Sequence, residues 1–261
     1  MQSKEIQGKL WSTAPDYWSV YFEPFFLPIY KKTLSQLNPS EGDLLLDAGC
    51  GSGMFSHMAI STGAAVTGVD AAPGLLKVAR ERNPGYNFLE EDLESLPFQT
   101  GTFHYVTGFN SFQYAGNVTA ALAEAGRVLA DKGRLVIAIW DKPEYSDATQ
   151  VLKAISTLLP PPPAGTPGPF ALSEDGAIEK ILDSIHMKLL YKARVSCPFL
   201  YRSTEEAVKS FMGTGPAAAA QNQVSREIVE ATIAESFKPF QVTEDLFHLQ
   251  NSFLLFIAEK N

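Results

Sequence analysis

Three closely spaced glycines, and an aspartate further along the chain, carry the clearest chemical signal in this sequence. Gly49, Gly51 and Gly53 follow an apolar run in the stretch LLLDAGCGSG, and Asp70 lies 19 residues beyond Gly51. Glycine lets the backbone turn sharply and lets a ligand approach it closely. A helix that starts behind such a turn presents unpaired amide groups and partial positive charge. We therefore expect the turn to hold part of a ligand, with a purely structural tight turn as the alternative.

Asp70 stands at the end of a second apolar run, and its spacing from the glycines indicates the kind of ligand. In nucleotide-binding α/β folds, an acid about 20 residues after the glycines binds the ribose hydroxyls. The spacing therefore predicts a ligand that contains a nucleoside. The alternative role for Asp70 is to cap the helix that follows it.

Two residues near the glycines argue against a dinucleotide. The dinucleotide fingerprint requires a small residue at its third position, where this chain has Met54. Asp47, just before the glycines, would repel a diphosphate but suits an ammonium group. The residues thus favour adenosine joined to a cationic amino acid, as in S-adenosylmethionine, over a nicotinamide dinucleotide.

Short apolar runs alternate with helical patterns through the first half of the chain, which predicts a parallel sheet covered on both faces. Asn117 is a suitable N-cap for the helix before the last of these runs. Before the first run, an aromatic opening is broken into short helices by its prolines. The predicted strands cover residues 44–47, 64–70, 86–92, 102–110 and 134–140.

The second half of the chain has a looser pattern. A proline-rich stretch at 159–169 predicts extended loop, and residues 187–201 and 246–260 each read as one strand. Between these strands we expect two helices, the first opened by a capping box at Ser203. We interpret this helical pair as an insertion.

The ordered set of motifs resembles the class I S-adenosylmethionine-dependent methyltransferases, in the small-molecule branch similar to quinone-biosynthesis enzymes. The resemblance rests on LLLDAGCGSG, VTGVDAAPGLLKVAR, FLEEDLESLPFQTGTFHYVTGFNSFQY and AGRVLADKGRLVIAIW, within residues 42–140. It implies a doubly wound α/β fold with a mostly parallel, seven-stranded Rossmann-like sheet and an antiparallel last strand. We expect an aromatic helical cap at 1–40 and a methyltransferase domain at 41–261, with the helical insertion at about 203–240.

The resemblance also assigns one group of residues to the methionine part of S-adenosylmethionine. Gly49, Gly51 and Gly53 would line it, with Cys50 at a variable position of the same turn. Asp47 would help to fix the amino group through water or backbone.

A second group, further along the chain, is assigned to the adenosine and to the floor of the site. Asp70 would hold the ribose hydroxyls, and Ala71 would lie against the adenine. Asp92 would meet the adenine amino group, with Leu93 packing beside it. Asn110 would form the floor of the methionine site.

The acceptor side is less clearly marked. Tyr17, Gln113 and Tyr114 are the first candidates, followed by Trp18 and Trp140, and the alternative for each aromatic residue is core packing. Asp141 is placed like a general base, although a solvated turn carboxylate is the alternative. The family's usual aspartate after the phenylalanine of the fourth strand is His104 here, which we expect to change a structural contact.

The resulting hypothesis is methyl transfer to a small organic acceptor by in-line displacement, with S-adenosylhomocysteine as the product. The alternatives are a non-catalytic S-adenosylmethionine-binding protein, acting as a sensor or partner subunit, and a nicotinamide-dependent oxidoreductase. A net charge of −8 without a basic cluster makes a nucleic-acid partner unlikely.

Other features of the composition set the expected environment. The two cysteines cannot form a disulfide framework, and no apolar leader or membrane-length run is present. We therefore expect a cytoplasmic protein without a membrane span. No histidine or cysteine pair has the spacing of metal ligands, so we predict no metal. The oligomeric state is not indicated.

Overall fold

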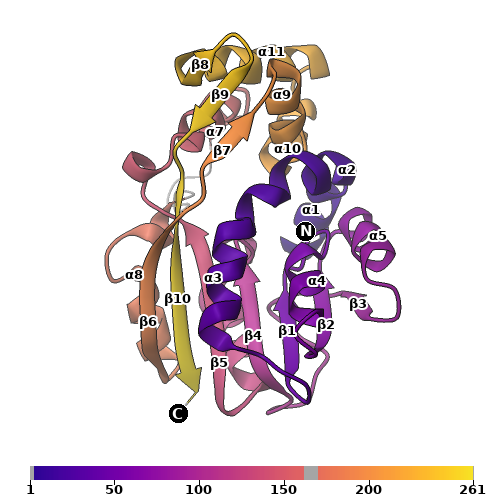
Figure 1. Ribbon diagram of the computed structural model, residues 1–261, viewed down its shortest axis with the longest axis vertical. Helices are drawn as coiled ribbons and strands as arrows, with labels where there is room; N and C mark the ends of the chain where they lie inside the picture. The colour runs from indigo at the N-terminus through magenta and orange to yellow at the C-terminus, as the bar shows by residue number, and fades with distance from the viewer. Residues whose placement is uncertain (1–2, 162–169, 261) are drawn as a thin grey trace.

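The computed structural model describes residues 3–161 and 170–260. A seven-stranded sheet forms the centre of the molecule (Figure 1). Most of the predicted proline-rich loop lies outside the described residues. The strand order is β3-β2-β1-β4-β5-β10-β6, and β10 runs antiparallel to both of its neighbours. This confirms the mostly parallel sheet with an antiparallel last strand. In sheet order, the strands are β3 (Asn87–Glu90), β2 (Ala65–Asp70), β1 (Leu44–Ala48), β4 (Phe103–Phe109), β5 (Leu129–Trp140), β10 (Ser252–Lys260) and β6 (Met187–Ser196).

Helices cover both faces of this sheet because alternate strand residues point to opposite sides. Leu45 and Val136 join the core on the side of α3 (Leu27–Leu37), α4 (Met54–Ile60) and α7 (Ala148–Ser156). Leu46 and Leu135 join the core beneath α6 (Val118–Val128) and α8 (Ala177–Ser184). A smaller cluster lies under α5 (Pro73–Arg82).

The strand order reverses between β1 and β4, and this reversal locates the site. The chain runs outward from β1 to β2 and β3, and then returns to place β4 on the other side of β1. In open α/β sheets, ligands bind beyond the carboxyl ends of the strands at such a point. The glycine turn follows β1, and Asn110 follows β4.

The N-terminal cap, residues 3–40, lies across this edge of the sheet as a series of short helical segments. They are α1 (Ser3–Trp11), α2 (Pro15–Tyr17), the π-helical turn η1 (Trp18–Phe22), the 3₁₀ turn η2 (Glu23–Phe26) and α3. Pro15, Pro24 and Pro28 each stand in the first residues of a segment, as predicted.

The C-terminal insertion, residues 199–249, differs from the predicted pair of helices. It contains a small antiparallel sheet, β7-β9-β8, and three helices. The unpredicted helix α10 has an alanine-rich sequence with no apolar periodicity, but its N-cap Thr214 and the following proline support it. The elements are β7 (Phe199–Tyr201), α9 (Thr204–Met212), α10 (Gly215–Gln221), α11 (Arg226–Phe237), β8 (Gln241–Thr243) and β9 (Leu246–Leu249).

The prediction of single strands at 187–201 and 246–260 is wrong, because both strands leave the main sheet partway. Pro198, which has no N–H, separates β6 from β7, and Asn251 separates β9 from β10. The Cys197 N–H donates to the Asn251 carbonyl at 2.8 Å across the crossing. Each predicted strand therefore contributes to two sheets.

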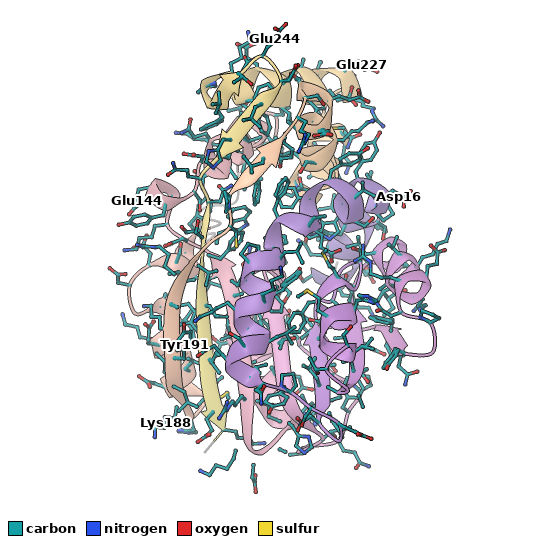
Figure 2. The ribbon with its side chains drawn as sticks, viewed as in Figure 1. Asp16, Glu144, Lys188, Tyr191, Glu227 and Glu244 are labelled. Carbon is teal, nitrogen blue, oxygen red and sulfur yellow. The ribbon has the colours of Figure 1, made fainter. Side chains whose placement is uncertain are left out.

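Charged side chains gather on the outside of the molecule. Asp16, Glu144, Lys188, Glu227 and Glu244 are all exposed and project from its periphery (Figure 2). Across the two described ranges, no helix is both long enough and apolar enough to cross a membrane.

Candidate functional site

The turn after β1 needs its glycines for both backbone conformation and space. Gly49, Gly51 and Gly53 have φ angles of 79°, 53° and 76°, in the left-handed region that other residues avoid. A Cβ on Gly49 would lie 2.1 Å from the Ser111 Cβ, and one on Gly53 would lie 2.9 Å from the Ala79 Cβ. The glycines therefore let the turn pack between the C-terminal half of α5 and the loop after β4.

The expectation that this turn leaves its amide groups unpaired is wrong. The N–H groups of Gly49 and Cys50 both donate to the Val69 carbonyl, at 2.7 and 2.9 Å. The Glu23 carboxylate, from the cap, accepts from the Met54 N–H at 3.4 Å, at the start of α4. A carboxylate of the protein thus occupies the helix terminus where a dinucleotide fold holds its diphosphate.

Asp70 is held rigidly at the end of β2. Its Oδ2 accepts from the Gly51 N–H at 2.8 Å, and its Oδ1 accepts from the Ala72 N–H at 2.9 Å. Burial raises the pKa of Asp70, and the backbone hydrogen bonds oppose that shift. The N-cap of α5 is Ala72, so Asp70 does not take the alternative capping position. Each carboxylate oxygen retains a lone pair for a ligand hydroxyl.

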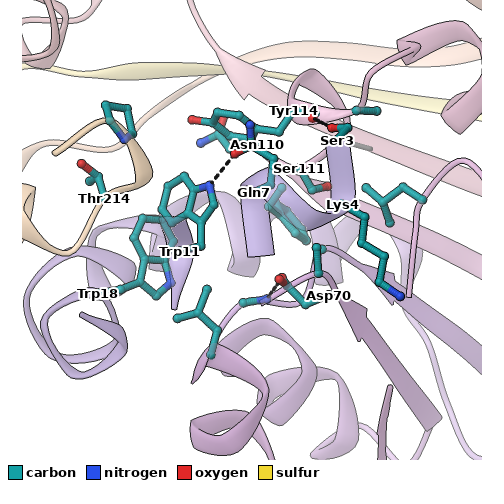
Figure 3. A pocket seen from close by; sticks show the side chains of 18 of the residues that line it. Ser3, Lys4, Gln7, Trp11, Trp18, Asp70, Asn110, Ser111, Tyr114 and Thr214 are labelled. Carbon is teal, nitrogen blue, oxygen red and sulfur yellow. Dashed lines mark hydrogen bonds between the residues drawn. The ribbon is translucent and has the colours of Figure 1, made fainter. Parts of the chain in front are cut away.

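A pocket of about 950 Å³, its open mouth included, lies beyond these strand ends and beneath the cap (Figure 3). The structure brings most of the predicted residues together in its walls. Those residues are Gly49, Gly51, Asp70, Ala71, Asp92, Leu93, Asn110, Tyr114, Trp18 and Trp140.

Five of the predicted residues do not line the pocket, among them Asp47. Its side chain is 1% exposed, and it accepts hydrogen bonds from Ser56 Oγ at 2.7 Å and Thr107 Oγ1 at 3.1 Å. Burial raises the pKa of Asp47 to about 7, against those two hydrogen bonds. A contact to the ligand through water or backbone stays a prediction.

The other four lie around the pocket. Cys50 and Gly53 face the packing between the turn and α5, where the Cys50 side chain joins a core cluster with Phe88. Tyr17 packs on Tyr21 at the cap, and Gln113 hydrogen-bonds to the half-buried Tyr114.

Sequence reasoning missed the contribution of α1, which crosses the mouth of the pocket. Ser3 Oγ donates to the Tyr114 carbonyl at 2.7 Å, and Lys4 Nζ donates to the Glu90 carbonyl at 2.9 Å. A Cβ on Gly8 would lie 2.3 Å from the Ala71 oxygen, so α1 approaches β2 closely. The one signal in the sequence is Gly8 within a polar helix, which indicates a close approach to another segment but not which segment that is. Further lining residues that were missed are Gln7, Trp11, Glu91, Ser111, Thr214 and Pro216.

Two buried polar atoms in the pocket wall have no hydrogen-bond partner among the described residues. They are Trp18 Nε1, a donor, and Asn110 Oδ1, an acceptor. Asn110 also has a φ angle of 50°, an unfavourable value for a residue with a side chain. Because unpaired buried polar atoms are costly, these two indicate a ligand that carries both an acceptor and a donor.

The charges around this part of the pocket favour a cation. Asp70, Glu91 and Asp92 line it, whereas the one lining cation among the described residues is Lys4. Behind the turn, Glu23 is 2% exposed and pairs with Arg82 at 2.7 Å while accepting from the Ser52 hydroxyl. Burial raises the pKa of Glu23, and Arg82 opposes this. We call this region, from Gly49 to Asn110, the cofactor end.

The opposite region, which we call the acceptor end, is mostly aromatic. Burial raises the pKa of Tyr114 to about 12, so this phenol stays protonated at neutral pH. The acceptor end consists of Trp11, Phe22, Phe26, Tyr114, Trp140, Leu152, Thr214 and Pro216, with Trp18 and Phe109 at its border with the cofactor end.

Asp141 and His104 both turn out to have structural roles. Asp141 is fully buried and forms an ion pair with Arg194, so it is neither a solvated turn carboxylate nor a base facing the pocket. His104 Nδ1 accepts from the Leu44 N–H at 3.0 Å, which is the structural contact expected for this position.

Residues 46–137, which contain the glycine turn, Asp70 and Asn110, match the family model described as "Methyltransferase domain". Residues 46–137 are therefore similar to methyltransferase domains. The chain is similar to the malonyl-[acyl-carrier protein] O-methyltransferase of Serratia marcescens, with 38% identity over 112 residues, 42% of this chain and 44% of that protein. It is also similar to the ubiquinone biosynthesis O-methyltransferase of Xanthomonas oryzae, with 33% identity over 126 residues, 46% of this chain and 53% of that protein.

The chain spans about half the length of the curated relatives it matches. The fold of the methyltransferase domain extends further than this sequence similarity. A solved structure of geranyl diphosphate methyltransferase in complex with SAM covers 89% of this chain and 84% of its own, with a TM-score of 0.52 and 17% identity. At that identity, the likeness concerns the fold alone.

Proposed function

We propose that this protein is an S-adenosylmethionine-dependent methyltransferase that acts on a small, uncharged and largely apolar acceptor. The observation that carries the proposal is the pocket itself, because it joins an acidic, nucleoside-type cofactor end to an aromatic acceptor end.

The residues of the cofactor end fit S-adenosylmethionine. Asp70 has lone pairs for the ribose hydroxyls, and Asp92 can accept from the adenine amino group, with Leu93 and Ala71 beside the ring. The unpartnered Asn110 Oδ1 suits the amino group of the methionine part. When bound, S-adenosylmethionine would supply a methyl group activated by attachment to a positively charged sulfur.

The chain's own contribution to methyl transfer would be to align the acceptor with the methyl group and to exclude water from the pocket. In-line displacement needs the acceptor's nucleophile opposite the leaving sulfur, and fixing this geometry can contribute several kcal/mol. The rings of Trp11, Trp18 and Tyr114 would hold a flat acceptor and exclude water. Because its pKa is raised to about 12, Tyr114 keeps its proton at neutral pH and cannot accept one as a general base. Tyr114 is the one titratable residue among the described residues of the acceptor end, so a nucleophile that needs no deprotonation at neutral pH would suit this end best.

In this proposal, residues 1–40 act as a cap on a catalytic domain at 41–261, and the insertion closes the acceptor end. Thr214 and Pro216 of the insertion line the pocket, which supports that role. A nicotinamide dinucleotide is disfavoured because the Glu23 carboxylate already accepts from the start of α4. The cytoplasmic location stays a prediction.

Thermal unfolding with S-adenosylhomocysteine tests the cofactor. At one hundred times its dissociation constant, a specific ligand stabilises a protein by about 2.7 kcal/mol, and NADH should give no shift. Asp70→Asn should lose the shift, because an amide cannot accept from both backbone N–H groups and the ribose. Glu90→Gln is the matched control, since it removes one charge at the end of β3 from an exposed side chain outside the lining.

Absence of any shift with S-adenosylhomocysteine, or an equal shift in Asp70→Asn, would contradict the proposal. Turnover separates an enzyme from a non-catalytic sensor or partner subunit. Conversion of S-adenosylmethionine to S-adenosylhomocysteine that depends on an added small-molecule extract is expected only of the enzyme.

A further inference from the structure

The indole nitrogen of Trp18 is a buried hydrogen-bond donor that has no partner within residues 3–161 and 170–260, and it lies against the glycine turn. A Cβ built on Gly51 would be 3.3 Å from Trp18 Nε1, so the nitrogen stands directly over this glycine. Figure 3 shows the Trp18 ring beside Trp11, with its nitrogen on the edge that faces the side of the pocket where Asp70 lies. The cap thus places a neutral N–H donor at the cofactor end.

The surrounding packing holds this ring in place. Trp18 stacks on Phe22 with ring centroids 4.9 Å apart, and Trp11 meets it edge-on at 5.0 Å. A Cβ on Gly213 of the insertion would lie 2.5 Å from the Trp18 backbone nitrogen. Trp18 also begins the π-helical turn η1, a wide turn that proteins often use at functional sites. An unpaired donor that is fixed by so many contacts is preorganised for a ligand.

The part of the chain that the structure describes offers this donor no acceptor. The Glu23 carboxylate lies nearby, with Oε1 3.7 Å from the same point above Gly51, but it makes no hydrogen bond to Trp18. Glu23 accepts instead from Ser52, Arg82 and the Met54 N–H. The acceptor for Trp18 Nε1 therefore has to come from the ligand.

The ligand in question has one group that needs such a donor. An amino-acid tail over the turn carries a carboxylate as well as an ammonium group, and no arginine of the described residues lines the pocket. Lys4, the lining cation, donates to the Glu90 carbonyl next to β2. Resting on the function proposed above, we infer that Trp18 Nε1 donates a hydrogen bond to the carboxylate of the methionine part of the cofactor. In this arrangement the cap binds the carboxylate of the amino-acid tail, and Asn110 Oδ1 accepts from the amino group of the same tail.

A pair of ligands that differ only in this carboxylate tests the inference. Binding of S-adenosylhomocysteine and of its decarboxylated analogue, S-adenosyl-3-thiopropylamine, is measured by calorimetry. The wild-type protein should prefer S-adenosylhomocysteine by about tenfold or more, because hydrogen bonds to charged groups are strong. In Trp18→Phe this preference should fall to threefold or less, and the affinity for the decarboxylated analogue should change little.

Trp11→Phe is the matched control. Trp11 lines the same pocket and loses the same bulk, but its Nε1 already donates to Gln7 Oε1 at 3.2 Å. Trp11→Phe should therefore weaken both ligands alike and keep the wild-type preference. An unchanged preference in Trp18→Phe overturns the inference and leaves the proposed function intact. Failure of the wild-type protein to bind S-adenosylhomocysteine overturns both.

A second measurement needs no change at Trp18. The chain has three tryptophans, so Trp11→Phe and Trp140→Phe assign the Trp18 indole N–H signal by elimination in ¹⁵N-labelled protein. S-adenosylhomocysteine should move this signal downfield, whereas the decarboxylated analogue should not. Equal shifts with both ligands, or none with either when both bind, count against the inference.

Discussion

At the cofactor end of the pocket, the walls are backbone and carboxylates from one continuous region of the chain. At the acceptor end, they are rings supplied by the cap, by the loops after β4 and β5 and by the insertion. Local hydrogen bonds such as Asp70 to Gly51 and Ala72 hold the first wall. Aromatic contacts between distant segments, such as Phe22 to Phe199 and Phe211, hold the second.

This difference indicates how the two ends can vary. The geometry of the cofactor end depends on single atoms, so one added methyl group or one lost charge should be felt strongly. The acceptor end depends on the summed packing of many rings, each of which can be exchanged at moderate cost. Changes at the glycine turn should therefore have larger effects than changes at the aromatic rings.

Gly49→Ala should have the largest effect. Its φ angle of 79° strains any other residue, and its new Cβ would meet the Ser111 Cβ at 2.1 Å. Strain and overpacking together cost about 4 kcal/mol, which should lower the melting temperature by roughly 8–16 °C. Gly176→Ala is the matched control, because Gly176 has the same φ of 79° with nothing within 4 Å of the added atom. Equal losses in the two variants would show that the close approach to Ser111 is unimportant.

Arg82→Met should rank second. It leaves the Glu23 carboxylate, which is 2% exposed, without its counter-ion between the cap and the glycine turn. Breaking a buried ion pair from one side costs about 3 kcal/mol, and chemical denaturation can measure the loss.

The double variant Glu23→Gln with Arg82→Met should recover part of this loss, because no charge remains buried. Lys77→Met, on the same helix, removes an exposed pair and should cost less than about 0.5 kcal/mol. If the double variant is less stable than Arg82→Met, the charge of Glu23 is not the cause.

Asp47→Asn should produce a pH-dependent gain. Burial raises the pKa of Asp47 from 3.8 to about 7, so the folded protein binds a proton that the unfolded chain has released between these values. Wild-type stability should therefore fall, relative to Asp47→Asn, as the pH rises from about 4 to about 7. Above that range, the variant should be more stable by about 2 kcal/mol, roughly half of the full linkage value, since the amide must rearrange two hydrogen bonds.

Denaturant unfolding at several pH values measures this difference. A difference between the two proteins that does not change from pH 4 to pH 8 would show that Asp47 is charged throughout.

Tyr114→Phe should have the smallest effect, because the acceptor end relies on rings. Losing the hydroxyl should cost less than about 1 kcal/mol and change the affinity for S-adenosylhomocysteine less than twofold. Since the pKa of Tyr114 is raised to about 12, its phenolate absorbance at 295 nm should be missing below pH 11. A difference spectrum between wild type and variant that develops near pH 8 would restore Tyr114 as a candidate base.

The sequence allowed the cofactor end to be predicted because its signals are local. Glycines that require positive φ, and an acid at a fixed distance, identify themselves by residue type. The same reasoning overestimated how many amide groups of the turn are free to bind a ligand, because Glu23, 31 residues before Met54, accepts from the N–H at the start of α4. Nothing in the local sequence indicates that contact.

The acceptor end could be predicted only in part, since its residues meet through the fold. Tyr114, Trp18 and Trp140 were found from their position near strand ends and in the aromatic opening, whereas Thr214 and Pro216 lie in the unpredicted helix α10. Asp141 was misjudged because its partner Arg194 lies 53 residues away. Two strands were predicted as too long, because a crossing between sheets leaves little mark beyond Pro198.

The crossing of β6–β7 with β9–β10 fixes the insertion to the main sheet, and it therefore limits how the acceptor end can be changed for a new acceptor. The insertion is a continuation of these strands, with Phe199 opposite Leu249 and Ser196 opposite Ser252. Removing one residue at Cys197 would reverse the faces of β7 and turn Phe199 away from Phe22 and Phe25. The cap is joined to β1 only through residues 38–43. Recombination between relatives should therefore exchange the cap as one block. The insertion would have to be exchanged together with both crossing strands, with their register preserved.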